Sequence, residues 1–407
     1  MIHTAVRGAE KALTDRGNDL TIYLDAGAAL LRGASPYAVV DYIYLPFFAA
    51  LVAPLTLLPA PWQVGIWQAC SVLCALAGIV GAARLVDPRR VCWWLAPATL
   101  FLTLRLWNSN FAYGQANAFT FAALIAALHA LRRGRDGWAG ALVGAAAAFK
   151  IVPLLAAAVL VARRRWRALA ATAAVSAGLL LGAPAALVGA RGALELHREW
   201  YATLAGPYVE GGEALLAAHP RLAGQSALAS FHRAFSGTLV SATNAELRAT
   251  IVLLPPATVK LLVRLWIAAH LIALCALLLR SAALARARSA SASDRLDVDG
   301  ALILCTALIV APLVHKAHMS WSALAFAVLL TRLAAARGRR ERALIGAPLV
   351  LAALAIGGTA RALIGQESAL RCLAYDSIFI GVELLWVGLV AASLSKAPAR
   401  DLELETA

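Results

Sequence analysis

The residues best suited to chemistry are ionisable groups that lie inside or beside long apolar runs. Asp19 precedes the run LTIYLDAGAALL, and Lys150 interrupts another run. His315 and His318 lie in a short polar link between two apolar runs. Charged side chains are costly at such positions, so each is a candidate functional residue. A carboxylate can take a proton from a hydroxyl group while cations and histidine stabilise a departing phosphate, so the set suits group transfer from a phosphate donor.

Each position taken alone also has a structural explanation. N-capping of a helix alone can explain Asp19, and Asp25 can lie on the solvated face of that helix. Lys150, and Arg105 in LTLRLWNSN, can extend their charged ends to the membrane surface. Aromatic residues that suit sugar faces are equally typical of interfacial belts, and they are Trp107, Trp200, Tyr201 and Trp321.

The composition restricts the class of protein. Hydrophobic residues make up 61% and charged residues 14% of the 407 positions, which is typical of a polytopic membrane protein. A spanning helix needs roughly 20 apolar residues, and such runs recur from residue 62 to residue 394. The net charge of +15 lies in short clusters between these runs, where it orients helices and does not indicate a nucleic-acid partner. We therefore expect an all-α, multi-pass protein of the cell membrane, surrounded by lipid.

The basic clusters predict a topology, because the positive-inside rule places them in the cytoplasm. They cover residues 84–90, 132–135, 163–167, 280–295, 332–342 and 396–400. The apolar run 137–162 has a cluster at each end, so a single crossing would break the rule. Pro153 removes a backbone donor and Lys150 adds a charge, so we expect two half-helices that meet there. The pattern gives about eleven crossings, with the polar residues gathered outside the cytoplasm.

The order of apolar runs and polar segments divides the chain into parts. Within the N-terminal part we expect an amphipathic helix lying on the membrane at 20–32 and a re-entrant or interfacial element at 46–59, which can also cross. Residues 1–17 have no apolar run, so we expect neither a signal peptide nor a helix before Asp19. The parts are an N-terminal catalytic motif (1–61), a transmembrane core (62–190), an extracytoplasmic loop (191–256), a C-terminal bundle (257–395) and a cytoplasmic tail (396–407).

Familiar nucleotide and metal motifs are missing from the sequence. It has no GxxxxGK[ST], no GxGxxG after a strand and no acidic pair in a cytoplasmic loop, so we expect no nucleotide sugar, metal or other cofactor. A donor that reaches the outer face without a soluble nucleotide has to come through the bilayer. A lipid-linked sugar phosphate meets that condition.

Several short motifs, in order along most of the chain, resemble glycosyltransferase family 87, the integral-membrane GT-C mannosyltransferases of actinobacteria that use polyprenyl-phosphate-mannose. The matching stretches are DLTIY at 19–23, GASPY at 33–37, YLP at 44–46, LP at 58–59, GQAN at 114–117, KIVP at 150–153, QS at 225–226 with Arg233, and APLVHKAHMSW at 311–321. Four positions depart from the family pattern: Leu45 replaces a proline, Gly224 an asparagine, His315 a tryptophan, and Ala317 the first of two histidines. The family also has a transmembrane helix before the aspartate motif, so either the start is assigned too late or the N-terminus lies outside.

The resemblance implies a GT-C fold and inverting transfer of mannose to an extracytoplasmic glycolipid or glycan, of the phosphatidylinositol mannoside or lipomannan type, with an α-1,2 linkage. Asp19 matches the position of the general base. The candidates for binding the donor phosphate are His318, Lys150, Arg105 and His315. The candidates for binding sugar or acceptor are Gln115, Asn117, Tyr23, Tyr44, Arg233 and Trp321.

Two other functions stay open at this point. A transferase of the same fold can use another sugar, such as arabinofuranose, because the shape of the pocket decides which sugar binds. A transporter or flippase for lipid-linked sugars is the other alternative. Transporters usually have inverted repeats, and the sequence shows no internal symmetry.

Overall fold

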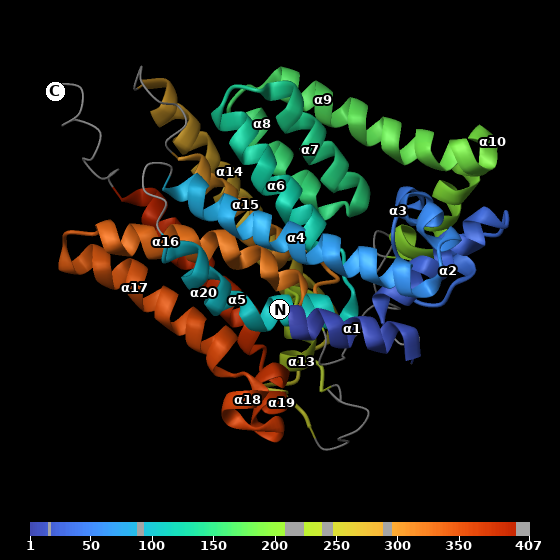
Figure 1. Cartoon of the computed structure of the whole chain (residues 1–407). Helices are drawn as coiled ribbons and strands as arrows, with labels where there is room; N and C mark the ends of the chain where they lie inside the picture. The colour runs from blue at the N-terminus through green and yellow to red at the C-terminus, as the bar shows by residue number, and fades with distance from the viewer. Residues whose placement is uncertain (15–17, 88–92, 208–223, 238–246, 288–294, 396–407) are drawn as a thin grey trace.

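The computed structural model describes residues 1–14, 18–87, 93–207, 224–237, 247–287 and 295–395, and this part of the chain is helical (Figure 1). Six of its helices are long and apolar enough to cross a membrane: Ala60–Val86, Trp166–Ala205, Pro256–Ala287, His318–Ala335, Arg339–Gly358 and Ser377–Leu394. The expectation of an all-α polytopic membrane protein is therefore confirmed. The number of crossings and the side on which each loop lies remain predictions.

The N-terminal region holds two short helices that pack inside the protein. Helix α1 (Ile2–Thr14) contradicts the expectation that no helix precedes Asp19. Its small residues face α4 and α5, and a side chain at Gly8 would come within 2.3 Å of the carbonyl oxygen of Phe111. Helix α2 (Asp19–Leu31) is buried along most of its length against α3 (Pro46–Val52) and η2 (Ala53–Leu57), so it does not lie on the membrane as an amphipathic surface helix.

Three helices link this region to the core. They are α4 (Ala60–Val86), α5 (Leu95–Tyr113) and α6 (Asn117–Arg132). Helix α4 packs along both α5 and α6. A side chain at Gly78 would come within 2.5 Å of the Phe121 ring, so this glycine allows α4 and α6 to approach closely.

The apolar run at 137–162 folds back on itself, as predicted. Helix α7 (Asp136–Phe149) ends directly before Lys150, which is extended, and Pro153 stands inside the short helix η3 (Val152–Ala156) that leads into α8 (Ala157–Ala162). The next helix, α9 (Trp166–Ala177), runs parallel to α7, because Thr172 Oγ1 donates to Gly140 O at 3.1 Å and Ser176 Oγ to Gly144 O at 3.2 Å. The segment that joins two parallel helices has to return between them, so the chain reverses near Lys150.

The segment predicted as one long loop contains helices. Helix α9 continues through η4 (Gly178–Gly182), α10 (Ala183–Trp200) and η5 (Tyr201–Ala205), with a break at Gly189, where φ is 74°. Farther on, α13 (Ala227–Phe235) packs against the long helix α14 (Pro256–Ala287). The expectation of a loop over the whole of 191–256 is therefore wrong for the residues of α10, η5 and α13.

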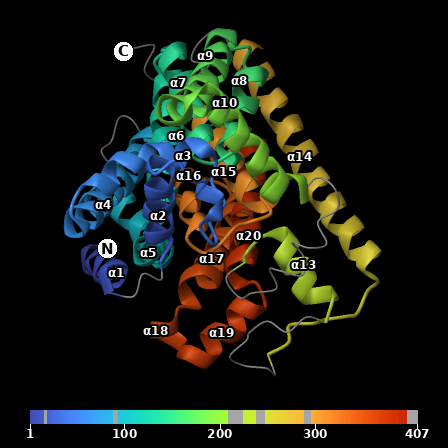
Figure 2. The same cartoon turned by 90° about the vertical axis from the view of Figure 1, so that its right-hand side faces the viewer.

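The C-terminal bundle surrounds α15 (Leu296–Val310), which is buried almost throughout. It packs against α14, η6 (His318–Ser322), α16 (Ala323–Ala335) and α20 (Ser377–Leu394), and α20 in turn packs against α17 (Arg339–Ala353) and η7 (Leu354–Gly358). Between η7 and α20 the chain forms α18 (Arg361–Ile364) and α19 (Gln366–Ala374). In both views α18 and α19 lie next to each other at the bottom of the picture, with α13 above them (Figures 1 and 2).

The two ends of the bundle differ in chemistry. Helix α6 begins at Asn117 and ends at Arg132, and α7 begins after Arg135 and ends before Lys150, so the basic clusters lie at the opposite end from Asn117 and Lys150. At the basic end, a buried ion pair joins Arg163 to Asp299 at 2.6 Å, and a partly buried one joins Arg332 to Asp297 at 3.1 Å.

Candidate active site

A continuous chain of polar contacts joins residues from four separate parts of the sequence. Gln115 Nε2 donates to Asp19 Oδ2 at 2.6 Å, and Asn117 Nδ2 donates to Gln115 Oε1 at 2.7 Å. Lys150 Nζ donates to Asn117 Oδ1 at 2.7 Å and lies 2.9 Å from His318 Nε2. We call Asp19, Gln115, Asn117, Lys150 and His318 the polar relay. Gln115 and Asn117 are buried, whereas the other members are partly accessible.

Helix α2 presents the carboxylate at its first turn. The N-cap is Asn18, whose side chain accepts a hydrogen bond from Thr21 N at 3.1 Å and donates to Gly8 O at 3.2 Å. Asp19 therefore occupies the first helical position and not the N-cap itself, which corrects the structural explanation given above. The free N–H groups of a helix N-terminus favour a negative charge there. Burial raises the pKa of Asp19 above its ordinary value, and the hydrogen bond from Gln115 lowers it again in part.

The turn between α5 and α6 brings Gln115 and Asn117 to this carboxylate. Gly114 has φ of +65°, and a side chain on it would come within 2.7 Å of Leu20 Cβ. Trp67 Nε1 donates to Gly114 O at 2.8 Å and fixes the turn. Only glycine combines this conformation with such a close approach, so the sequence Gly-Gln-x-Asn is tied to the position of α2.

The hydrogen bonds of His318 determine which of its nitrogens carries the proton. The backbone N–H of His315 donates to His318 Nδ1 at 3.2 Å, so Nδ1 accepts. In the neutral ring Nε2 then carries the hydrogen, and it points at Lys150 Nζ, 2.9 Å away. An ammonium group has no free electron pair to accept this hydrogen bond. The geometry therefore corresponds to an uncharged Lys150 amine.

Aromatic side chains flank the lysine. Lys150 Nζ lies 5.3 Å from the centre of the Tyr44 ring, and the Tyr44 and Tyr23 hydroxyl oxygens are 2.7 Å apart. Burial raises the pKa of both tyrosines, so their hydroxyl groups stay neutral. Trp321 Nε1 donates to Asn117 O at 3.1 Å. The structure thus brings Tyr23, Tyr44 and Trp321 to the polar relay, and their roles in binding a sugar or acceptor stay predictions.

Two predicted residues make their contacts elsewhere. Arg105 Nη1 donates to Ile356 O at 2.7 Å and to Thr359 Oγ1 at 2.6 Å, which connects α5 to η7. Arg233 is fully buried in an ion pair with Asp376. The structure does not show either side chain in contact with the polar relay, so their roles in ligand binding stay predictions. His315 contacts the relay through its backbone N–H and through its ring, which packs edge-on against the His318 ring with the two ring centres 5.9 Å apart.

Sequence reasoning missed Asp376 and Trp67. Asp376 looks like an ordinary polar residue before a helix, and only its contact with Arg233 across the sequence distinguishes it. Trp67 lies in an apolar run, and nothing local shows that its indole N–H fixes the turn at Gly114.

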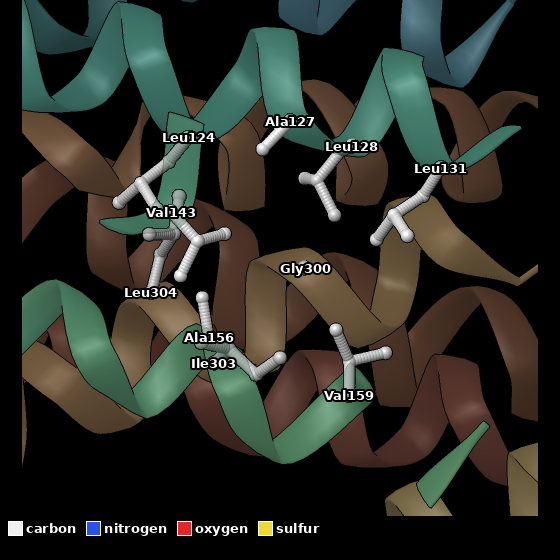
Figure 3. A pocket seen from close by; sticks show the side chains of 10 residues that line it. All are labelled: Leu124, Ala127, Leu128, Leu131, Val143, Ala156, Val159, Gly300, Ile303 and Leu304. Atoms are coloured by element: carbon white, nitrogen blue, oxygen red, sulfur yellow. The ribbon is translucent and has the colours of Figure 1, made fainter. Parts of the chain in front are cut away.

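An apolar pocket lies deeper in the bundle, between α6, α7, α8 and α15 (Figure 3). Its lining is aliphatic and includes Leu128, Val143 and Ile303. None of the described residues that line it carries an ionisable or hydroxyl side chain. The polar relay, at the end of the same helices, is the candidate active site.

These features define a helical membrane protein with a carboxylate, an amine and an imidazole at one end of its bundle. Within that class, the chain belongs to glycosyltransferase family 87, whose family model matches residues 42–293. The family expected from the sequence motifs is confirmed. No solved structure matches the chain.

Two curated relatives are similar to part of the chain. Both are polyprenol-phosphate-mannose-dependent alpha-(1-2)-phosphatidylinositol pentamannoside mannosyltransferases. The protein from Mycolicibacterium smegmatis is 37% identical over 179 residues, which cover 39% of this chain and 40% of the relative. The protein from Mycobacterium tuberculosis is 29% identical over 166 residues, which cover 37% of this chain and 38% of the relative. The similar region thus spans well under half of each relative.

The turn at Gly114 generates a prediction. In Gly114→Ala the new methyl group pushes against Leu20 and displaces Asp19 from Gln115, and we expect the rate of sugar transfer to fall roughly 10²-fold, as misplacement by about 1 Å can do. The matched control is Gly134→Ala, because Gly134 has a similar φ of +68° with nothing within 4 Å of the added atom. Equal losses of activity in the two variants, at equal thermal stability, would show that strain in the turn and not the position of Asp19 is responsible.

Proposed function

We propose that this protein transfers mannose from polyprenyl-phosphate-mannose to a hydroxyl group of an extracytoplasmic glycolipid, with inversion at the anomeric carbon. The observation that carries the proposal is the polar relay, which joins one accessible carboxylate to an amine and an imidazole without any nucleotide motif nearby. The donor class and the α-1,2 linkage are supported by the relatives from mycobacteria, whose names state both.

Asp19 is the general base in this proposal. Gln115 occupies its Oδ2, and among the described residues nothing donates to Oδ1, which leaves that oxygen for the acceptor hydroxyl. As Oδ1 takes the hydroxyl proton, the acceptor oxygen attacks the anomeric carbon from the face opposite the phosphate. The bond from that carbon to the phosphate oxygen breaks, and the phosphate keeps the electron pair.

Lys150 and His318 bind the phosphate. The pair donates hydrogen bonds and, once Lys150 has taken up a proton with the anion, supplies positive charge to the departing polyprenyl phosphate. Tyr44 lies beside the lysine and suits one face of the sugar. The buried amides of Gln115 and Asn117 fix the position of Asp19 relative to the phosphate-binding pair, Lys150 and His318.

The difference between the two ends of the bundle supports an active site on the outer side of the membrane. The basic clusters lie at the end opposite the polar relay, and positive charge is enriched in cytoplasmic loops. A lipid-linked donor and a glycolipid acceptor would then meet at the outer surface, where both can diffuse in the bilayer to the site. A phosphatidylinositol mannoside is the acceptor that the relatives favour.

The test of the base is Asp19→Asn in purified protein supplied with labelled polyprenyl-phosphate-mannose and a phosphatidylinositol mannoside acceptor. We expect a loss of about 10² to 10⁴ in kcat, because a positioned base contributes that much. The matched control is Asp25→Asn on the exposed face of the same helix, and it should keep its activity. Full activity of Asp19→Asn would overturn the assignment. Movement of the donor across vesicles without transfer would favour the transporter alternative.

The pKa of Asp19 predicts how the rate depends on pH. Since the base must be ionised and burial raises its pKa, kcat/KM should fall on acidification at a pH above the ordinary range of an aspartate. In Gln115→Leu the carboxylate loses the hydrogen bond that favours its charged form, so the acid limb should move to higher pH. Rates measured from about pH 4 to 8 would reveal the shift. An unchanged acid limb in this variant would contradict the assignment of that limb to Asp19.

A further inference from the structure

Outside the polar relay, a buried ion pair joins two helices that are far apart in sequence. Asp376 precedes α20 in the left-handed conformation, with φ of 61°, and its Oδ1 accepts hydrogen bonds from Arg233 Nη2 and, at 2.8 Å, from Ser230 Oγ. The Arg233 side chain is 0% exposed. Burying two charges is costly and gives little net stability, so such a pair suggests a role in fixing a conformation.

The pair holds one particular segment of backbone. Arg233 Nη2 also donates to Gly224 O at 2.7 Å. From this segment Gln225 N donates to Val314 O at 2.6 Å, and Ser226 Oγ donates to Pro312 O at 2.8 Å. Residues 224–226 are therefore bound between the ion pair on one side and residues 312–315 on the other.

The second segment leads directly to the polar relay. Gly224 and His315 form an antiparallel backbone bridge, and the N–H of His315 donates to His318 Nδ1 at 3.2 Å. That hydrogen bond selects the tautomer of His318 that faces Lys150. A continuous path of contacts thus runs from Asp376 through Arg233, Gly224 and His315 to the imidazole.

We propose that Asp376 and Arg233 are positioning residues for the donor phosphate: their ion pair holds residues 224–226 against 312–315 and thereby fixes the ring of His318 for binding. The inference rests on the proposed function only in taking the ligand to be a polyprenyl phosphate. Neither residue touches the ligand. Both act through the backbone of His315.

The chain supplies a matched control for this idea. Arg163 and Asp299 form another buried ion pair, with side chains 8% and 4% exposed, at the opposite end of the bundle. A pair that only stabilises the fold should behave like this one. Asp299→Asn and Asp376→Asn make the same change at the two sites, so their comparison separates positioning from general stability.

The experiment is a double-mutant cycle with His318→Gln. We expect Asp376→Asn to raise the donor KM, and the inhibition constant for polyprenyl phosphate alone, roughly tenfold, with kcat much less affected. In the His318→Gln background the same substitution should add little, because the ring through which it acts is gone. Asp299→Asn should have the same small effect with or without His318. Additive effects of Asp376→Asn and His318→Gln would overturn the proposal.

A milder variant tests the proposal in case Asp376→Asn fails to fold. Ser230→Ala removes only the neutral hydrogen bond to Asp376, and it should weaken inhibition by polyprenyl phosphate a few-fold, again only when His318 is present. Equal weakening without His318 would count against the proposal. An active wild-type protein with additive effects rejects this inference alone, whereas a wild-type protein that transfers no mannose rejects the proposed function.

Discussion

The structure depends on one constraint: ionisable groups at the end of an apolar bundle have to find partners. A carboxylate, an amine and an imidazole would each be costly to bury alone. The polar relay satisfies them together, with each amide donating on one side and accepting on the other. Each hydrogen bond in the polar relay is donated toward Asp19, from His318 through Lys150, Asn117 and Gln115. The removal of one member would leave its neighbours without a partner in surroundings of low polarity, so the stability of each member depends on the others.

The fold supplies this arrangement through interruptions in its helices. Asp19 stands at the start of α2, Gln115 in the turn at Gly114, and Lys150 where α7 stops before Pro153. His318 begins η6 after a non-helical link. Polar backbone and side chains are tolerated near lipid only where protein surrounds them or where they line a water-filled cavity. The buried amides of Gln115 and Asn117 meet the first condition, whereas Asp19, Lys150 and His318 stay partly accessible. The long helices therefore serve mainly to bring four interruptions to the same end of the bundle.

Much of the site could be predicted from the sequence, because its residues sit in short local motifs. The reversal at Lys150 followed from a proline and a charge inside one apolar run with basic residues at both ends. The burial of α2 could not be predicted, since its apolar spacing is equally typical of a surface helix. Helix α1 was missed because its buried face consists of small residues, so the segment lacks the long apolar run expected of a membrane helix. The pairing of Arg233 with Asp376 joins residues 143 positions apart, and no local pattern reports such a contact.

The two buried amides have a consequence of their own. A carboxylate and an amine placed side by side would lock together, each cancelling the charge that the other needs for work. Gln115 and Asn117 lie between the two groups and keep them apart, and no ion pair joins Asp19 to Lys150 within the described residues. An amide passes on orientation but does not readily relay a proton. In the proposed function the carboxylate can thus act as a base at one end while Lys150 takes up its proton at the other, so a single small site can serve the acceptor and the donor separately.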